Sequence, residues 1–186
     1  MFQELSHTLK ISKEGFNINE KIKNVVNDMQ SNEDDKVEII FVEPAEDAIV
    51  VEADTIRIYE VISNLLTNAI KFTKNGRSSS DSNVSSIGPI TISAALKLSQ
   101  DYKKGRSIES GSDQIIVSIR DRTTGIDPDI QSRLFTRFAT NSDTGSGLGL
   151  FVSKGIIEDH DVRIWAENNK DGKGSTFHFS RLPLHT

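Results

Sequence analysis

The sequence predicts an α+β fold, a two-layer α/β sandwich in which a mixed, mostly antiparallel sheet packs on about three helices. Apolar residues recur at helical spacing in two long segments, and β-branched residues dominate several shorter runs. The last two of these runs flank a glycine-containing turn, as in a hairpin. With 186 residues, 35% of them hydrophobic, the chain has the size and apolar content of one domain.

The first part of the chain is predicted to contain a helix and two strands. Asn17 can cap a helix, with Glu20 placed as in a capping box, and apolar residues follow at helical spacing as far as Met29. The runs Val37–Val42 and Ile49–Val51 are typical of strands.

The middle of the chain holds the strongest helix prediction, Asp54–Phe72, which carries a continuous apolar stripe. Residues 75–88 are serine-rich and indicate a flexible loop. The alternating runs Ile90–Leu98 and Gln114–Arg120 predict strands, and the polar segment Ser99–Asp113 predicts a long loop between them.

The last part is predicted to contain two helices and a hairpin. Asp127 followed by Pro128 favours a helix start, and Ile130, Leu134 and Phe138 would form the apolar face of that short helix. The elements expected after it are the helix Leu150–Ile157 and the strands Val162–Glu167 and Ser175–Arg181. Residues 1–15 are polar and weakly patterned, so we interpret them as a tail or the remnant of an upstream linker, and residues 16–186 as the domain.

The composition excludes several classes of protein. A net charge of −5 leaves no basic surplus to neutralise nucleic-acid phosphates. The chain has no cysteine, which excludes disulfides and thiolate metal sites. No apolar run approaches the length that spans a bilayer, so we expect a cytoplasmic domain, either free or part of a membrane-bound sensor.

The helix Asp54–Phe72 also carries a polar stripe, formed by Glu60, Asn64, Asn68 and Lys71. At 100° per residue these side chains fall within roughly 80° of arc. Carboxylate and amide oxygens suit Mg²⁺, and a lysine can contact a phosphate. A solvated helix face would show the same residue types, although two asparagines one turn apart are unfavourable in a helix without a role.

Two further segments could form a nucleotide site. Asp121 follows an apolar strand, where its carboxylate could accept a hydrogen bond from an amine, and Gly125 would let the backbone approach a flat ring. A simple turn at the end of a strand would contain the same residue types. Three glycines alternate through Gly145–Gly149 before an apolar helix, and their amides could cradle phosphate, although a flexible linker has a similar composition.

In this order the segments resemble the ATP-binding domain of sensor histidine kinases, which belongs to the larger group that includes Hsp90, type II topoisomerases and MutL. The resemblance covers roughly residues 15–183 and implies the sandwich of the Bergerat type. The segments similar to the family motifs are EVISNLLTNAIKFT at Glu60–Thr73, RDRTTGID at Arg120–Asp127, LFTRF at Leu134–Phe138, GSGLGLFVSKGIIEDH at Gly145–His160 and GKGSTFHF at Gly172–Phe179.

The resemblance implies a role for each matching residue, with ATP and Mg²⁺ as cofactors. Asn64 and Asn68 would coordinate the metal, with Asn64 and Glu60 as the catalytic candidates, Glu60 as a base or water-positioning residue. Lys71 would contact a phosphate, Asp121 would accept from the adenine amine, and Gly125 would line the base. The remaining implied nucleotide contacts are the lid residues Thr144, Gly145, Ser146, Gly147, Leu148 and Gly149, and Thr176 on the adenine side.

The chain departs from the family pattern in three places. Thr123 stands where the family has a glycine, and a β-branched residue tolerates positive φ poorly. The lid between Phe138 and Gly145 is short. His7 lacks the sequence context of a phosphoacceptor and lies too near Asn64 for two long intervening helices, so we do not interpret it as one.

The resemblance therefore implies the catalytic domain of a histidine kinase, which donates the γ-phosphoryl group of ATP to a histidine on a separate dimerisation domain. Its other expected partner is a response regulator. Two alternatives stay open at this point. One is a related Ser/Thr protein kinase of the anti-sigma-factor kind. The other is a degenerate nucleotide-binding fold that serves as an interaction module.

Overall fold

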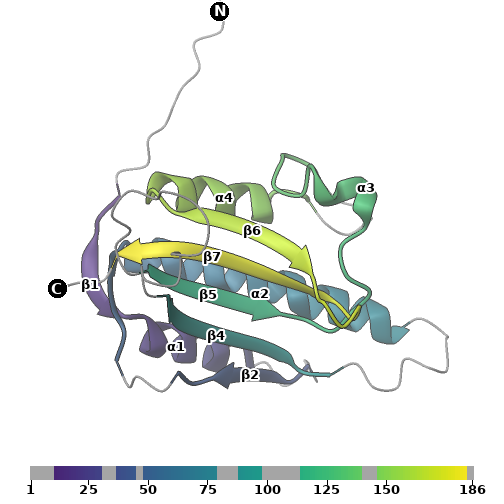
Figure 1. Cartoon of the computed structure of the whole chain (residues 1–186), viewed down its shortest axis with the longest axis horizontal. Helices are drawn as coiled ribbons and strands as arrows, with labels where there is room; N and C mark the ends of the chain where they lie inside the picture. Colours follow the sequence, from purple (N-terminus) through teal and green to yellow (C-terminus); the bar gives the residue numbers. More distant parts are fainter. Residues whose placement is uncertain are drawn as a thin grey trace, which may run out of the picture.

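The computed structural model describes residues 11–30, 37–44, 48–78, 88–97, 114–139 and 146–183. Its centre is a five-stranded sheet with helices stacked against it as a second layer (Figure 1). This arrangement confirms the predicted α+β sandwich. The predicted loop Ser99–Asp113, most of the loop 75–88, residues 1–10, and the lid residues Thr144 and Gly145 lie outside the described part of the chain.

The strands of the sheet follow the spatial order β2 (Ile39–Val42), β4 (Ile90–Lys97), β5 (Gln114–Arg120), β7 (Ser175–Pro183) and β6 (Arg163–Asn168). Only the β2–β4 pair is parallel, and the other neighbours are antiparallel, as predicted. The predicted hairpin of the last two strands is also confirmed. The arrangement places the C-terminal end of β5 beside the start of β7, with Arg120 opposite Thr176.

A second, two-stranded sheet joins β1 (Glu14–Asn17) to β3 (Val50–Ala53). The sequence analysis did not predict β1, which begins inside the segment interpreted as a tail. Its four residues contain one apolar side chain, Phe16, so no alternation marks it as a strand. Pairing with β3, which sets Phe16 opposite Val51, determines its conformation instead.

Three long helices, α1 (Ile18–Gln30), α2 (Thr55–Ser78) and α4 (Gly149–Asp159), contact the strands β4, β5 and β6 respectively. Helix α2 continues past Asn75, where a loop was predicted to start. Gly76 lies within this extension, and a glycine inside a helix costs only about 1 kcal/mol relative to alanine, which does not by itself end a helix. Among the described residues no helix is both long and apolar enough to cross a membrane.

The short helix α3 (Pro128–Gln131) begins at Asp127, whose side chain accepts from the backbone N–H of Asp129 as predicted. It ends sooner than predicted, because tight turns with backbone bonds three residues apart replace the α-helical pattern. Ile130 and Leu134 still face the interior, but Phe138 does not. Phe138 is 68% exposed and has a φ of 61°, so the expectation that it completes an apolar helix face was wrong.

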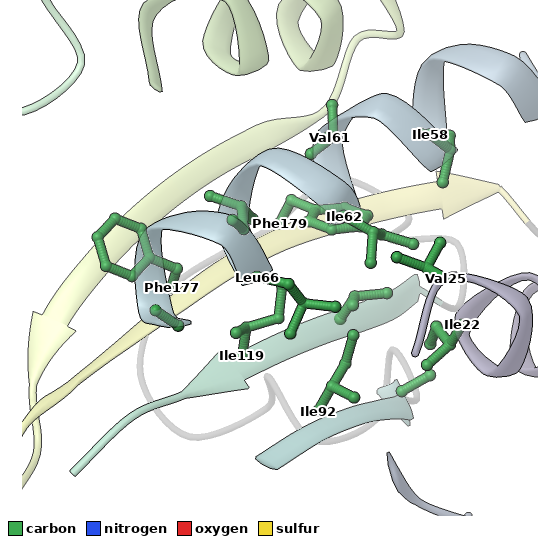
Figure 2. Packing of buried hydrophobic residues seen from close by; sticks show 14 of the residues in the cluster. Ile22, Val25, Ile58, Val61, Ile62, Leu66, Ile92, Ile119, Phe177 and Phe179 are labelled. Carbon is green, nitrogen blue, oxygen red and sulfur yellow. The ribbon is translucent and has the colours of Figure 1, made fainter. Parts of the chain in front are cut away.

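The hydrophobic core fills the space between the sheet and the helices. Figure 2 shows Ile58, Ile62 and Leu66 of α2 directed toward the side chains of the sheet strands, with Ile22 and Val25 of α1 beside them. Each large aliphatic side chain that is fully buried contributes roughly 1.5–3 kcal/mol. The predicted apolar stripe of α2 is therefore the surface by which this helix is fixed against the sheet.

The N-terminus of α2 is capped by Asp54, a buried carboxylate. Its Oδ1 accepts from the backbone N–H groups of Ile56 and Arg57, each at 3.1 Å, and its Oδ2 accepts from that of Ser12 at 3.1 Å. Burial raises the pKa of Asp54. The backbone donors outweigh that effect, so the pKa lies below its ordinary value.

His160 connects the end of α4 to this cap. Its Nε2 accepts from the backbone N–H of Asp54 at 3.0 Å, and its Nδ1 lies 2.7 Å from the carbonyl oxygen of Ile156. Because Nε2 accepts, the ring proton is on Nδ1, which donates to that carbonyl. The buried imidazole thereby fixes α4 relative to α2, the two helices that bound the site described next.

We expect the substitution His160→Ala to lower the free energy of unfolding by about 1–3 kcal/mol, because the buried N–H of Asp54 would lose its acceptor. Urea denaturation followed by circular dichroism measures the change. Lys154→Ala is the matched control on α4, since Lys154 forms an exposed pair with Glu158, and it should stay within about 0.5 kcal/mol of the parent. Equal stability of the two variants would contradict the assigned role.

Candidate functional site

A cavity of about 450 Å³ lies between the C-terminal half of α2, the loop after β5, and the start of α4. This volume is in the range of small-molecule sites. The described residues that line it come from these elements and from the segment around α3: Asn68, Lys71, Phe72, Asp121, Thr123, Thr124, Gly125, Ile126, Asp127, Ile130, Leu134, Ala139, Ser146, Gly147, Gly149, Leu150, Ser175 and Phe177.

The cavity brings together most of the residues that the sequence analysis selected. The predicted site residues that line it are Asn68, Lys71, Asp121, Gly125, Ser146, Gly147 and Gly149. The described ones that do not line it are Glu60, Asn64, Leu148 and Thr176, and their assignments stay predictions. Three separate segments of the chain therefore converge on one cavity.

The polar stripe of α2 divides into two parts. Asn68 and Lys71 lie at the cavity, whereas the first two members contact neighbours on the protein. Glu60 forms an ion pair with Arg57 at 3.0 Å, and the Nδ2 of Asn64 donates to the Oγ of Ser153 in α4 at 3.4 Å. The buried Ser153 hydroxyl gives Asn64 a contact that positions α4 beside α2.

Asp121, which directly follows β5, is a buried carboxylate with only 3% of its surface exposed. Its Oδ1 accepts from the backbone N–H groups of Thr123 at 3.0 Å and Ser175 at 3.3 Å, and from the Thr123 hydroxyl at 2.6 Å. Its Oδ2 accepts from the Ser175 hydroxyl at 2.7 Å. These donors compensate the desolvation of the carboxylate, which would otherwise be prohibitive.

Ser175 is a site residue that the sequence analysis missed. It had selected the adjacent Thr176, whose hydroxyl donates to Asn169 Oδ1 at 2.6 Å. Successive side chains of a strand point to opposite faces, so only one of the two can reach Asp121. The alternation of β7 carried the signal, because Ser175 shares the face of the buried Phe177.

The hairpin between β6 and β7 braces the loop after β5. Asn168 bonds both backbone groups of Ile126, accepting from its N–H at 2.6 Å and donating to its carbonyl at 3.1 Å. The buried Asn169 donates to the carbonyl oxygen of Asp121 at 2.8 Å. The sequence analysis interpreted this segment only as a turn, because side-chain bonds to a distant loop leave no local pattern.

Two glycines allow this close approach. Gly125 has a φ of 84°, and a Cβ there would lie 2.7 Å from Asn168 Oδ1. Gly174 has a φ of 81°, and a Cβ there would collide with the carbonyl oxygen of Asp121. Thr123, by contrast, is not among the described residues with positive φ. The loop thus avoids the conformation that would have made this threonine unfavourable.

The glycine-rich segment leads into α4 beside the cavity. Gly147 has a φ of 65° and its carbonyl oxygen accepts from the backbone N–H of Phe138 at 3.1 Å. A Cβ on Gly147 would come within 2.7 Å of the Phe138 backbone, so the close contact requires glycine. Leu148, at the N-cap of α4, makes no side-chain capping bond, so its side chain leaves the first amides of this helix uncapped.

The charges around the cavity are few. Lys71 is the one cationic side chain among the described lining residues, and Asp121 and Asp127 are the acidic ones. Outside the cavity, the backbone N–H of Lys173 lowers the pKa of Asp171, and so do Arg120 and Arg122, which pair with it at 2.7 and 3.7 Å. These pairs tie the exposed side of the hairpin to the loop that carries Asp121.

The amino-acid sequence of the chain is similar to that of several sensor kinases. The sensor protein FixL of Bradyrhizobium diazoefficiens is 33% identical over 134 residues, which cover 72% of this chain and 22% of FixL. The adaptive-response sensory kinase SasA of Synechococcus elongatus is 34% identical over 137 residues, covering 72% of this chain and 29% of SasA. The chain thus spans less than a third of the length of these relatives.

Two solved structures share the fold. The catalytic domain of histidine kinase ThkA, in a nucleotide-free form, superposes with a TM-score of 0.64 at 27% identity, over 91% of this chain and 96% of that domain. Full-length ShkA in complex with AMPPNP gives a TM-score of 0.71 at 21% identity, over 96% of this chain and 32% of ShkA. Residues 53–186 match the family described as histidine kinase-, DNA gyrase B-, and HSP90-like ATPases. The chain belongs to this family.

Proposed function

We propose that this chain is the Mg·ATP-binding catalytic domain of a sensor histidine kinase, which transfers the γ-phosphoryl group of ATP to a histidine on a separate dimerisation domain. The observation that carries the proposal is the convergence of Asn68, Lys71 and the buried Asp121 on one cavity. Support also comes from ThkA, whose catalytic domain this chain matches nearly end to end, and from ShkA, which was solved with AMPPNP.

The base of the nucleotide fits the end of the cavity formed by Asp121 and Gly125. A carboxylate accepts hydrogen bonds and so suits an exocyclic amine. Gly125, which has no side chain, leaves room for a flat ring against the backbone, and Leu134, Ile130 and Phe177 supply apolar walls.

The phosphates fit the end formed by Lys71, Asn68 and the glycine-rich segment. Lys71 would neutralise part of their charge, and the backbone amides at the start of α4 would donate to them. Thr144 and Gly145 would extend this cradle over the phosphates. Positioning and charge stabilisation of this kind account for most of the catalysis of phosphoryl transfer.

The donor set suits Mg²⁺ held jointly with the nucleotide. Among the described residues no cluster of three His, Cys, Asp or Glu side chains could hold a metal alone. Mg²⁺ is commonly bound by few protein oxygens together with substrate phosphates, and the amide oxygen of Asn68 at the cavity fits that pattern. Asn64 would serve as a second ligand after rotating away from Ser153. When bound, the metal would neutralise charge that develops on the phosphates.

Glu60 is the proposed base or water-positioning residue. It precedes Asn64 by one turn of α2 and its side chain is 38% exposed, so an incoming acceptor domain could reach it. Its pairing with Arg57 would hold the carboxylate at the helix surface until the acceptor docks.

The partners and location follow from the same proposal. The acceptor histidine would be supplied by a dimerisation domain and the phosphoryl group passed on to a response regulator, with the reaction in the cytoplasm. The alternative of a degenerate interaction module was motivated by Thr123. Because Thr123 adopts no positive φ and its hydroxyl bonds to Asp121, this departure gives no reason to expect a defective site.

We expect the chain to bind ADP in the presence of Mg²⁺, and Asp121→Asn to weaken that binding at least about tenfold, because the amide replaces an acceptor with a donor. Isothermal titration calorimetry measures both affinities. Asp171→Asn is the matched control, since Asp171 lies on the exposed side of the hairpin and pairs with Arg120. An unmodified chain that fails to bind ADP at millimolar concentration would overturn the proposed function.

Lys71→Ala should weaken ATP binding about tenfold while leaving adenosine binding nearly unchanged, because the lysine is assigned to a phosphate and not to the base. Competition titrations with the two ligands separate these effects. Lys74→Ala, an exposed lysine on the same helix, serves as control. Equal losses for ATP and adenosine would show that Lys71 does not act through the phosphates.

Transfer of labelled γ-phosphate from ATP to a purified dimerisation domain should give a product that loses its label in acid, as phosphohistidine does. Scintillation counting before and after acid treatment distinguishes it from phosphoserine. An acid-stable product on a protein acceptor would favour the Ser/Thr kinase alternative instead.

A further inference from the structure

Thr123 lines the cavity, at a position where the histidine kinase pattern described above has glycine. Its side chain contacts Asp121. Its hydroxyl donates to Asp121 Oδ1 at 2.6 Å, and its backbone N–H donates to the same oxygen at 3.0 Å. The substitution therefore introduces a hydrogen-bonding group beside the carboxylate assigned to the nucleobase.

The contact distributes the donors unevenly over the carboxylate. From the described residues, Oδ1 receives three donors, whereas Oδ2 receives only the Ser175 hydroxyl. A carboxylate has about four lone-pair positions, two on each oxygen. The acceptor position left for a ligand is therefore on Oδ2, and two hydrogen bonds from Thr123 hold the carboxylate in the orientation that presents it.

The hydroxyl of Thr123 is itself restricted by this bond. A hydroxyl has one hydrogen and two lone pairs, and here the hydrogen is committed to Asp121. Its oxygen can then only accept from a ligand. Asp121 and Thr123 together offer acceptors to the cavity and no side-chain donor.

We propose, resting on the function proposed above, that Thr123 is a positioning residue for Asp121 and a second acceptor for the amino group of the nucleobase. An amino group at C6 of a purine can donate to both residues. A carbonyl at the same place would meet lone pairs, and the buried acceptors would lose their partner. Thr123 thus increases selectivity for a 6-aminopurine over a 6-oxopurine.

The test compares ADP with inosine diphosphate on four forms of the chain. Thr123→Val keeps the side-chain shape but removes the hydroxyl, and Thr123→Ser keeps the hydroxyl. Thr91→Val is the matched control. Thr91 lies on β4 between the buried Ile90 and Ile92, so its side chain points to the sheet face away from the core and the cavity.

We expect Thr123→Val to weaken ADP binding about tenfold and to affect inosine diphosphate less, so that the selectivity ratio falls about threefold or more. Thr123→Ser should stay within about threefold of the parent in both affinities, and the control should match the parent. A merely structural role would lower both affinities equally and leave the ratio unchanged.

The outcomes separate this inference from the proposed function. If the parent binds ADP and Thr123→Val keeps the same selectivity ratio, the role of Thr123 is wrong and the proposed function stands. If the parent binds no ADP, both are wrong. Circular dichroism checks that each variant is folded, and Thr123→Ala replaces Thr123→Val with the same expected result if the valine variant is not.

Discussion

The buried carboxylate of Asp121 is the constraint on which the arrangement of the site depends. A charge with 3% of its surface exposed is stable only when donors surround it, and removing one of the donors of such a group costs about 1–3 kcal/mol or more. Its donors come from two segments far apart in sequence, Thr123 in the following loop and Ser175 at the start of β7. The carboxylate therefore fixes the end of β5 to the start of the last strand, where this end of the cavity lies.

The same requirement explains the hairpin that precedes Ser175. To bring this serine to Asp121, the backbone must pass so close that Gly174 has no space for a side chain. The two asparagines before the turn then bond the loop, Asn168 to Ile126 and Asn169 to the carbonyl of Asp121. The loop is held by side chains of a neighbouring hairpin, so its geometry is set before any ligand binds, which reduces the entropy lost on binding.

The fold and most of the cavity could be predicted because their signals are local. The apolar stripe of α2 and the alternation of β5 are visible in short stretches of sequence. Asn68 and Lys71 lie on that helix and Asp121 directly follows that strand, so the same stretches locate these polar residues. The errors arise where contacts are distant. Strand β1 exists through its pairing with β3, and Phe138 leaves the interior because the α3 segment winds into tight turns and its own N–H bonds to Gly147. Ser175 was missed because motif similarity was followed without applying the alternation of the strand, and the assignment of Thr176 stays a prediction.

The two ends of the cavity differ in the hydrogen-bonding and charged groups that they offer to a ligand. The end at Asp121 offers hydrogen-bond acceptors held in place by protein donors, whereas the opposite end offers, among the described lining residues, one cation, Lys71, and one amide side chain, Asn68. A triphosphate carries several negative charges, and Asp121 and Asp127 add to them in the same cavity. Of the described lining groups, one lysine and the backbone amides at the start of α4 carry less positive charge than the phosphates and these carboxylates carry negative charge. A divalent cation that arrives with the nucleotide would offset this charge, which supports the proposal above that the ligand of this site is a metal–nucleotide complex.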